Sequence, residues 1–284
     1  MAVAASQEPQ RPLIPHPAHQ PRGASRVNHS KPTTLDIQLQ VLSALILRDM
    51  RTRFGRTIWG NLVVVLWPSA HVLIIVATMA LRGMAAPLGE SAVLFIFTGM
   101  GPMVVFMYLS RKMMEGVTIN RPLLSFPDVK FLDLCMSRAV VEIMNIAASI
   151  VITMLIVAAL GIDPLPEHAA TAIAALLGTF VFALGIGLVN ASIVTVFPPY
   201  MVGFALVIIT MYGLSGVFFV PDGMPEDLYN VFMWNPMTHA IMWFRSAYYP
   251  GYGEDASPLY VIMTGACLIF LGLLCERAFT RKSL

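Results

Sequence analysis

Charged residues and cysteines are scarce in this sequence. Only 12% of its 284 residues are charged, whereas soluble domains carry about 25%. The formal net charge of +2 is too small to indicate a nucleic-acid partner. The three cysteines, Cys135, Cys267 and Cys275, lie in or beside apolar runs and lack metal-ligand spacing. We therefore expect them to be small packing residues that form neither a disulfide nor a metal site.

Motifs that carry catalysis are also missing. The sequence holds no Gly-x-x-x-x-Gly-Lys-Ser/Thr phosphate loop, no His-Glu-x-x-His and no Gly-x-Ser-x-Gly. No pair of carboxylates lies within an apolar run. We therefore predict no catalytic residue, no metal ligand and no cofactor bound by this chain.

Long hydrophobic runs take the place of these motifs, and 57% of the residues are hydrophobic. A membrane-spanning helix needs about 20 mostly apolar residues. The 54 residues from 168 to 221 contain no charge and are broken by Phe197-Pro198-Pro199, which favours two helices there. The sequence thus predicts an all-α integral membrane protein with six spans, at 61–81, 92–110, 139–160, 169–194, 200–220 and 256–275.

The distribution of Lys and Arg predicts the orientation. Sixteen of the 18 lie in 1–60, 111–138 and 277–282, which six spans place on one side, and only Arg82 and Arg245 lie on the other. Because cytoplasmic loops carry the excess of Lys and Arg, both termini are expected in the cytoplasm.

The region before the first span has two parts. Residues 1–32 hold six prolines and no apolar run, which predicts a disordered cytoplasmic tail. Residues 33–56 begin with Thr33 and Asp36 at capping-box spacing and continue with leucines at helical spacing. This pattern predicts an amphipathic helix on the membrane surface, or one packed on the protein itself. Its basic residues are Arg48, Arg51, Arg53 and Arg56.

Aromatic residues gather between the last two spans. Residues 218–252 contain ten of the chain's 28 aromatics, and the segment 221–258 is interrupted by prolines. This pattern predicts short helices that dip into the membrane from outside, although an aromatic belt at the lipid interface explains part of it.

A basic segment, 111–133, joins the second and third spans. Its sequence is RKMMEGVTINRPLLSFPDVKFLD, which predicts a polar knob on the cytoplasmic face or a plain connecting loop. Acidic residues at membrane depth are few, so we expect the energy for transport to enter from a partner.

Five segments, in order along the chain, resemble a known family. They read RDMRTRFGR at 48–56, WPSAHVLI at 67–74, the N-RPLLSFPDVKFLD stretch at 120–133, LSGVFFVPDGMPE at 214–226 and WNPMTHAIMWFRSAYYPGYGE at 234–254. Together they resemble the permease of capsular-polysaccharide ABC exporters (KpsM-type) and, more distantly, the O-antigen permease (Wzm-type). Only the proline-rich tail lies outside the resemblance.

The resemblance implies an ATP-driven exporter of lipid-linked capsular polysaccharide in the bacterial inner membrane. It implies a homodimer of six-span domains (57–284) with two cytoplasmic ATP-binding subunits, which hold the ATP and Mg, and with periplasmic or outer-membrane export components. It makes 33–56 an interface helix, 111–133 the coupling segment and 221–258 the periplasmic gate. The implied coupling residues are Glu115, Asn120, Arg121 and Asp128. The implied gate and path residues are Trp234, Trp243, Tyr248, Tyr249, Tyr252 and His71.

His71 either binds sugar hydroxyls in the conduit or makes a hydrogen bond between helices. The family commonly has acids where this sequence has Trp67 and Met242-Trp243, so the contacts of the substrate at those positions stay open. Export of O-antigen, teichoic acid or a small lipid or drug is the alternative function. An intramembrane enzyme is disfavoured by the missing motifs.

Overall fold

The computed structural model describes residues 33–54, 58–83 and 85–280, which contain helices and no strand. The predicted disordered tail, 1–32, and Arg56 lie outside this part of the chain. The elements are α1 (Thr34–Phe54), α2 (Ile58–Leu81), α3 (Ala92–Asn120), η1 (Arg121–Ser125), α4 (Phe131–Ala159), α5 (Ala169–Val196), α6 (Tyr200–Leu214), α7 (Glu226–Met233), α8 (Pro236–Ser246), α9 (Pro258–Cys275) and η2 (Glu276–Thr280).

Five of the described helices, α2, α3, α4, α5 and α9, are long and apolar enough to cross a membrane. The predicted span at 200–220 forms a shorter helix than expected. Helix α6 has 15 residues and ends at Leu214 instead of continuing to residue 220. Gly216 follows with a positive φ of 75°, a conformation that a helix does not contain. The structure therefore supports a multi-pass membrane protein, while the count of six spans stays a prediction.

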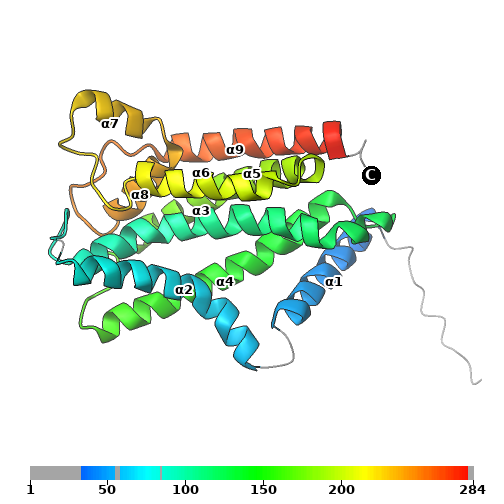
Figure 1. The fold of residues 1–284 in the computed structure, drawn as a ribbon, viewed down its shortest axis with the longest axis horizontal. Helices are drawn as coiled ribbons and strands as arrows, with labels where there is room; N and C mark the ends of the chain where they lie inside the picture. Colours follow the sequence, from blue (N-terminus) through cyan, green and yellow to red (C-terminus); the bar gives the residue numbers. More distant parts are fainter. Residues whose placement is uncertain (1–32, 55–57, 84, 281–284) are drawn as a thin grey trace, which may run out of the picture.

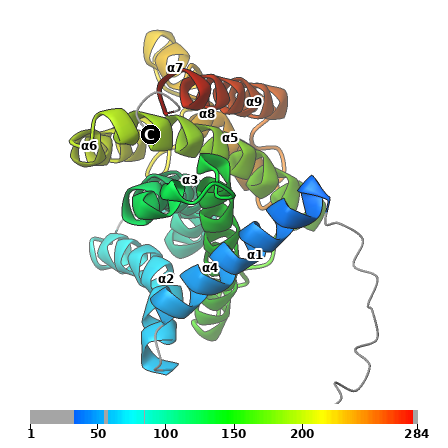
Figure 2. The same cartoon turned by 90° about the vertical axis from the view of Figure 1, so that its right-hand side faces the viewer.

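Helix α3 forms the centre of the bundle. Most of its residues are buried, and it packs against α2, α4, α5 and α8. Figures 1 and 2 show α4 and α2 on one side of α3, and α5, α6 and α9 on the other. Its buried face carries Phe95, Met100, Phe106, Leu109 and Met113. Residues 92–110, predicted as a span, carry no charge, and a helix that is apolar all round suits this central position.

Helices α5 and α9 approach each other so closely that only glycine fits between them. A Cβ atom on Gly185 would lie 2.7 Å from the carbonyl oxygen of Gly265, and one on Gly265 would lie 2.8 Å from the backbone nitrogen of Phe182. Small residues let membrane helices pack backbone to backbone. The glycines of the apolar run around residue 185 thus serve helix packing.

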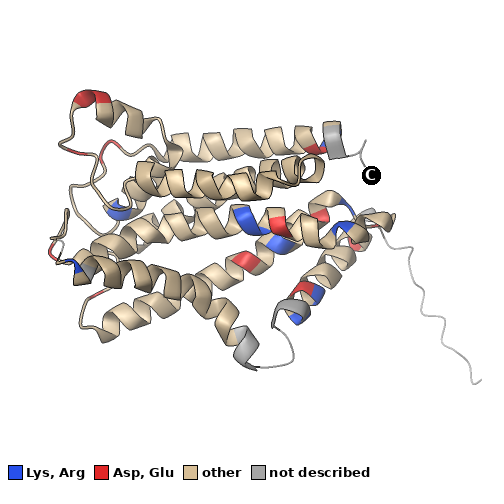
Figure 3. Cartoon of the chain, viewed as in Figure 1, with Lys and Arg blue, Asp and Glu red and all other residues tan. Residues whose placement is uncertain are grey.

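The two ends of the bundle differ in charge, as Figure 3 shows. One end, called here the basic end, holds α1, the last turns of α3, η1 and the end of α9 (Figure 1). The opposite end, called the α7/α8 end, carries the acidic residues Glu226 and Asp227 at the start of α7. The described chain thus begins and ends at the basic end of the bundle.

Candidate functional site

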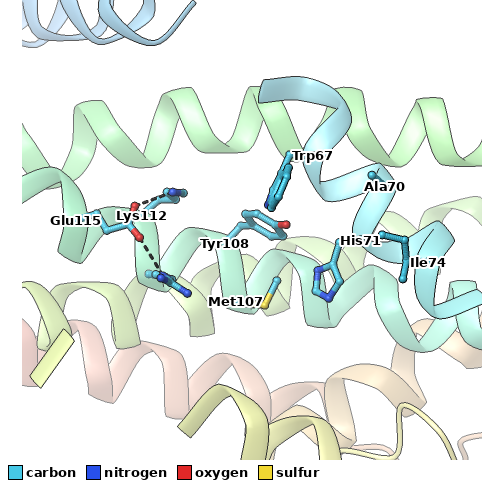
Figure 4. Close-up of a pocket in the computed structure, with 9 residues that line it drawn as sticks. Trp67, Ala70, His71, Ile74, Met107, Tyr108, Lys112 and Glu115 are labelled. Carbon is cyan, nitrogen blue, oxygen red and sulfur yellow. Dashed lines mark hydrogen bonds and ion pairs between the residues drawn. The ribbon is translucent and has the colours of Figure 1, made fainter. Parts of the chain in front are cut away.

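A cavity of about 470 Å³ opens between α2 and α3. It is lined by Trp67, Ala70, His71, Ile74, Met107, Tyr108, Arg111, Lys112 and Glu115 (Figure 4). The first four belong to α2 and the other five to α3. The cavity therefore runs from the apolar part of the bundle to the basic end. It brings His71, a predicted path residue, and Glu115, a predicted coupling residue, into one site.

Local sequence explains how α2 presents its side of the cavity. Pro68 lies inside α2 and cannot donate a backbone hydrogen bond, so the helix bends there (Figure 1). The next residue, Ser69, is buried and its hydroxyl lies 2.7 Å from that of Ser149 in α4. This contact fixes one face of α2 against α4, which leaves Trp67 and His71 to face α3 and the cavity.

His71 makes a hydrogen bond between helices. Its Nε2 lies 3.2 Å from the hydroxyl of Tyr212 in α6, and its ring lies edge-on to Tyr108. His71 therefore connects α2 to α6, and its ring also lines the cavity.

The rim of the cavity carries a small ionic cluster. Arg111 Nε lies 2.9 Å from one oxygen of Glu115, and Lys112 Nζ lies 2.6 Å from the other. Glu115 follows Arg111 by four residues, so both side chains lie on one face of α3. The cluster combines two cations with one carboxylate and leaves the rim positively charged.

The predicted coupling residues separate into two groups. Glu115 and Asn120 are half-buried and face inward, and the Asn120 amide donates to the Gly116 carbonyl oxygen. Arg121, the first residue of η1, and Asp128, in the turn after η1, are exposed. The apolar side chains of Ile119 and Phe126 are also exposed near them, by 69% and 58%. The outward-facing knob therefore consists of Ile119, Arg121, Phe126 and Asp128.

Helix α1 contacts this region through Arg48. Arg48 Nη1 donates to the Asn120 side-chain oxygen at 3.1 Å. The capping box is formed, with Thr33 and Asp36 exchanging hydrogen bonds of 2.9 and 3.2 Å. Arg51 is exposed. Arg53 belongs to α1, but its side chain lies outside the described part, as does all of Arg56.

The five predicted gate aromatics occupy different environments. Tyr248 and Tyr252 are buried, and Trp243 and Tyr249 are half-buried. Tyr248 packs against Phe97 and Phe244. Only Trp234, at the end of α7, is strongly exposed, by 80%. The structure therefore gathers these residues at the α7/α8 end without placing them on one common surface.

Sequence analysis missed Arg245, which organises the α7/α8 end. Its side chain is fully buried in α8, and its terminal amino groups donate to four backbone carbonyl oxygens, those of Phe95, Gly216, Val217 and Phe219. Its guanidinium also lies 3.9 Å from the centre of the Phe95 ring. Asn235 and Thr238 of α8 donate to the Leu214 carbonyl oxygen. Helix α8 thus provides hydrogen-bond donors for the backbone carbonyl oxygens that have no helical partner where α6 ends.

Within the described ranges, no group of three or more His, Cys, Asp or Glu side chains is arranged to hold a metal ion. The polar residues of the cavity are instead suited to binding. They offer aromatic faces, hydrogen-bond donors and a positive rim, and no activated nucleophile accompanies them.

Comparison with known proteins places this arrangement in a family. The family model described as ABC-2 type transporter matches residues 40–249. The polysialic acid transport protein KpsM of Escherichia coli is 28% identical over 247 residues, covering 85% of this chain and 94% of that protein. The capsule polysaccharide export inner-membrane protein CtrC of Neisseria meningitidis serogroup A is 28% identical over 252 residues, covering 87% and 94%. The corresponding BexB protein of Haemophilus influenzae is 21% identical over 249 residues, with the same shares.

The family match spans α2 to α8 and includes every residue that lines the cavity. It includes four of the five long apolar helices, α2, α3, α4 and α5. The chain is a multi-pass membrane protein that belongs to the ABC-2 type transporter family.

Proposed function

We propose that this chain is the permease subunit of an ATP-driven exporter that moves lipid-linked capsular polysaccharide across the bacterial inner membrane. The observation that carries the proposal is the alignment with capsule-export relatives over 94% of their length, including proteins named for export through the inner membrane. The cavity between α2 and α3 supports it, because aromatic faces and hydrogen-bond donors suit sugar rings.

The proposed topology has six spans with both termini in the cytoplasm. The 15 residues of α6 reach about 22 Å, which is shorter than the hydrocarbon core of about 30 Å. The non-helical residues 215–220 extend this path, and their carbonyls are bound by Arg245. Irregular backbone is tolerated at membrane depth only where protein satisfies it. In this topology α7 and α8 are re-entrant gate helices at the periplasmic side.

ATP hydrolysis is assigned to separate ATP-binding subunits, two for a homodimer of this chain. These 284 residues lack a phosphate loop. The knob of Ile119, Arg121, Phe126 and Asp128 at the basic end offers exposed apolar and charged groups for docking. Export components on the periplasmic side complete the proposed assembly.

The knob gives a test of the coupling. Phe126→Ala removes a ring that is 58% exposed, so the protein level in the membrane should stay normal while co-purification of the ATP-binding subunit falls. Leu165→Ala changes a comparably exposed apolar residue beyond α4, at 67% exposure, and serves as the matched control. Unchanged co-purification with Phe126→Ala would place the docking surface elsewhere.

The export function is tested by deleting the gene and measuring surface polysaccharide. The proposal expects capsular polysaccharide to disappear from the surface and to accumulate inside the cell. Restoring the gene should return it to the surface. Loss of O-antigen with an intact capsule would support the alternative exporter class and contradict this one.

A further inference from the structure

His239 of α8 connects the end of α7 to the start of α9. Its Nε2 lies 2.8 Å from the Met233 carbonyl oxygen, and its Nδ1 lies 3.1 Å from the backbone nitrogen of Ser257. Met233 is the last residue of α7, and Ser257 is the N-cap of α9. One imidazole ring therefore bridges two elements that meet at the α7/α8 end (Figure 1). These three residues are called here the clasp.

The two partners define the protonation state of the ring. A carbonyl oxygen only accepts a hydrogen bond, so Nε2 must carry a hydrogen and donate it to Met233. A backbone N–H only donates, so Nδ1 must keep its lone pair to accept from Ser257. A protonated ring donates through both nitrogens, and its Nδ1–H would point at the Ser257 N–H. The clasp therefore requires neutral His239, because a protonated ring loses the contact with Ser257.

The surroundings of the ring do not favour a positive charge within the clasp. His239 is 6% exposed, and among the described residues it forms no ion pair. Helices α5 and α9, which pack against α8, carry no charged residue. The guanidinium of Arg245 binds backbone carbonyls of α3 and of residues 216–219. A buried charge without a partner is costly, so protonation is favoured only when the clasp opens to water.

Other titratable groups lie near the clasp. Tyr260 of α9 lies edge-on to the His239 ring, with the ring centres 5.2 Å apart. The remaining ones at this end of the bundle are Asp222, Glu226, Asp227, Tyr229, Glu254 and Asp255. Histidine is the side chain whose charge ordinarily changes between about pH 5 and 8, which separates it from tyrosine.

Helix α7 depends on a small number of contacts. It has no buried residue. Two further hydrogen bonds lead from this helix and the residue after it to the same segment, 255–260. The Tyr229 hydroxyl donates to Asp255 at 2.6 Å, and the Tyr260 hydroxyl donates to the Trp234 carbonyl oxygen at 2.9 Å. Loss of the clasp should therefore change the distance between α7 and α9.

We propose that His239 is a pH-dependent positioning residue, which joins α7 to the start of α9 while it is neutral and releases the start of α9 when it is protonated. The clasp itself stands on the contacts above. Its effect on export rests on the proposed function, in which α7 and α8 are gate helices on the periplasmic side. The position of these helices then follows the pH of the compartment that they face.

The distance between α7 and α9 tests the clasp in the full chain, extracted from membranes in polymer-bounded discs with the subunits that it carries. Spin labels are attached at Asn230→Cys and Leu259→Cys, two exposed positions on these helices. The accessible cysteines Cys267 and Cys275 are replaced by Ala, and Cys135 is buried. Pulsed electron paramagnetic resonance measures the distances at about pH 8 and at about pH 5.

One short distance should dominate at about pH 8, and the ratio of joined to released chains should fall about tenfold at about pH 5. His239→Gln should give the same distances at both pH values, because its amide donates and accepts but does not titrate. His239→Ala should give the longer distances at both. His168→Gln removes an exposed histidine at the same end of the bundle and is the matched control, which should respond like the wild type.

Asp222 provides a second control. Burial and the charge of Asp255 raise the pKa of this carboxyl, so it also gains a proton more readily than usual. Asp222→Asn should leave the response of the wild type unchanged. A response that persists in His239→Gln, or that is lost in Asp222→Asn, assigns the titration to another group and overturns the proposal. Equal distances at both pH values in the wild type overturn it as well.

Measuring surface polysaccharide separates the clasp from the export function. If the labels report no change with pH while the gene still restores surface polysaccharide, the clasp fails and the export function stands. If the labels respond as predicted while the gene has no effect on surface polysaccharide, the export function fails and the clasp stands.

Discussion

Arg138 in α4 holds the carboxylate of Asp49 in α1, with its Nη1 atom 2.7 Å from both carboxylate oxygens. The side chains are 7% and 14% exposed. Arg138 Nε also donates to the Lys112 carbonyl oxygen in α3 at 3.3 Å. One guanidinium therefore connects the predicted interface helix to the turn of α3 that forms the cavity rim.

Removing either partner of this pair should destabilise the protein strongly. Asp49→Ala leaves a buried guanidinium without its carboxylate, which costs about 3 kcal/mol in the free energy of unfolding. Arg138→Ala should cost a similar amount, and the double variant less than the sum of both. Chemical unfolding of the four proteins in the same detergent measures this. Additive losses would show that the two residues act independently.

Arg245 should be essential for the stability of the α7/α8 end. Arg245→Ala leaves four backbone carbonyls without their donor, which should cost at least about 3 kcal/mol. Arg245→Lys keeps the charge with fewer donors in a different geometry and should be intermediate. Membrane abundance and unfolding temperature provide the measurement. An alanine variant as abundant and stable as the wild type would show that these hydrogen bonds contribute little.

The close approach of α5 and α9 predicts opposite effects at two glycines. Gly265→Ala places a methyl group 2.8 Å from the Phe182 backbone nitrogen, so we expect a loss of about 1–3 kcal/mol from overpacking. Gly203→Ala in α6 meets no atom within 4 Å and should stabilise its helix by about 0.5–1 kcal/mol. Unfolding temperatures compare the two variants. Equal effects would contradict the packing described for α5 and α9.

Tyr229 and Asp255 predict a pH-dependent contact at the α7/α8 end. The Tyr229 hydroxyl donates to Asp255 at 2.6 Å. Burial, followed by this hydrogen bond and the charge of Asp255, raises the pKa of Tyr229 to about 12. A raised pKa favours the protonated phenol in the folded state, so the contact is fully present below the usual value near 10 and is lost as the pH rises through 12.

The fluorescence of Trp234 reports this loss, because Trp234 directly follows α7. It is measured in a variant whose other tryptophans are replaced by Phe. A change in its emission as the pH rises through about 12 is expected with Tyr229 and should be absent with Tyr229→Phe. The same alkaline step in both proteins would assign it to another group.

The sequence predicts the long helices well because spanning needs long apolar runs, and these are visible without any contact. Thr33 and Asp36 form their capping box for a similar reason, since both partners lie within one turn. The end of α6 at Leu214 was not predictable from hydrophobicity, because residues 215–220 are as apolar as the helix before them. That end depends on Arg245, which lies 29 residues beyond Gly216.

The site was predictable only in part for the same reason. His71 was named as a path residue and Glu115 as a coupling residue from the family resemblance, but nothing in the spacing joins them in one cavity. The sequence pattern did not identify Tyr108 and Tyr212, because a single tyrosine in an apolar helix does not indicate a functional site. Asp49 is 89 residues from Arg138, so their contact requires the packing of α1 on α4.

Transport into inverted membrane vesicles tests whether this chain exports capsular polysaccharide with energy from ATP. Vesicles that contain the chain and its ATP-binding subunit receive labelled lipid-linked capsular polysaccharide from outside. We predict uptake that requires ATP and both proteins and that stops when ATP is replaced by a non-hydrolysable analogue. Uptake without ATP, or none in vesicles whose ATP-binding subunit is present and hydrolyses ATP, would contradict it.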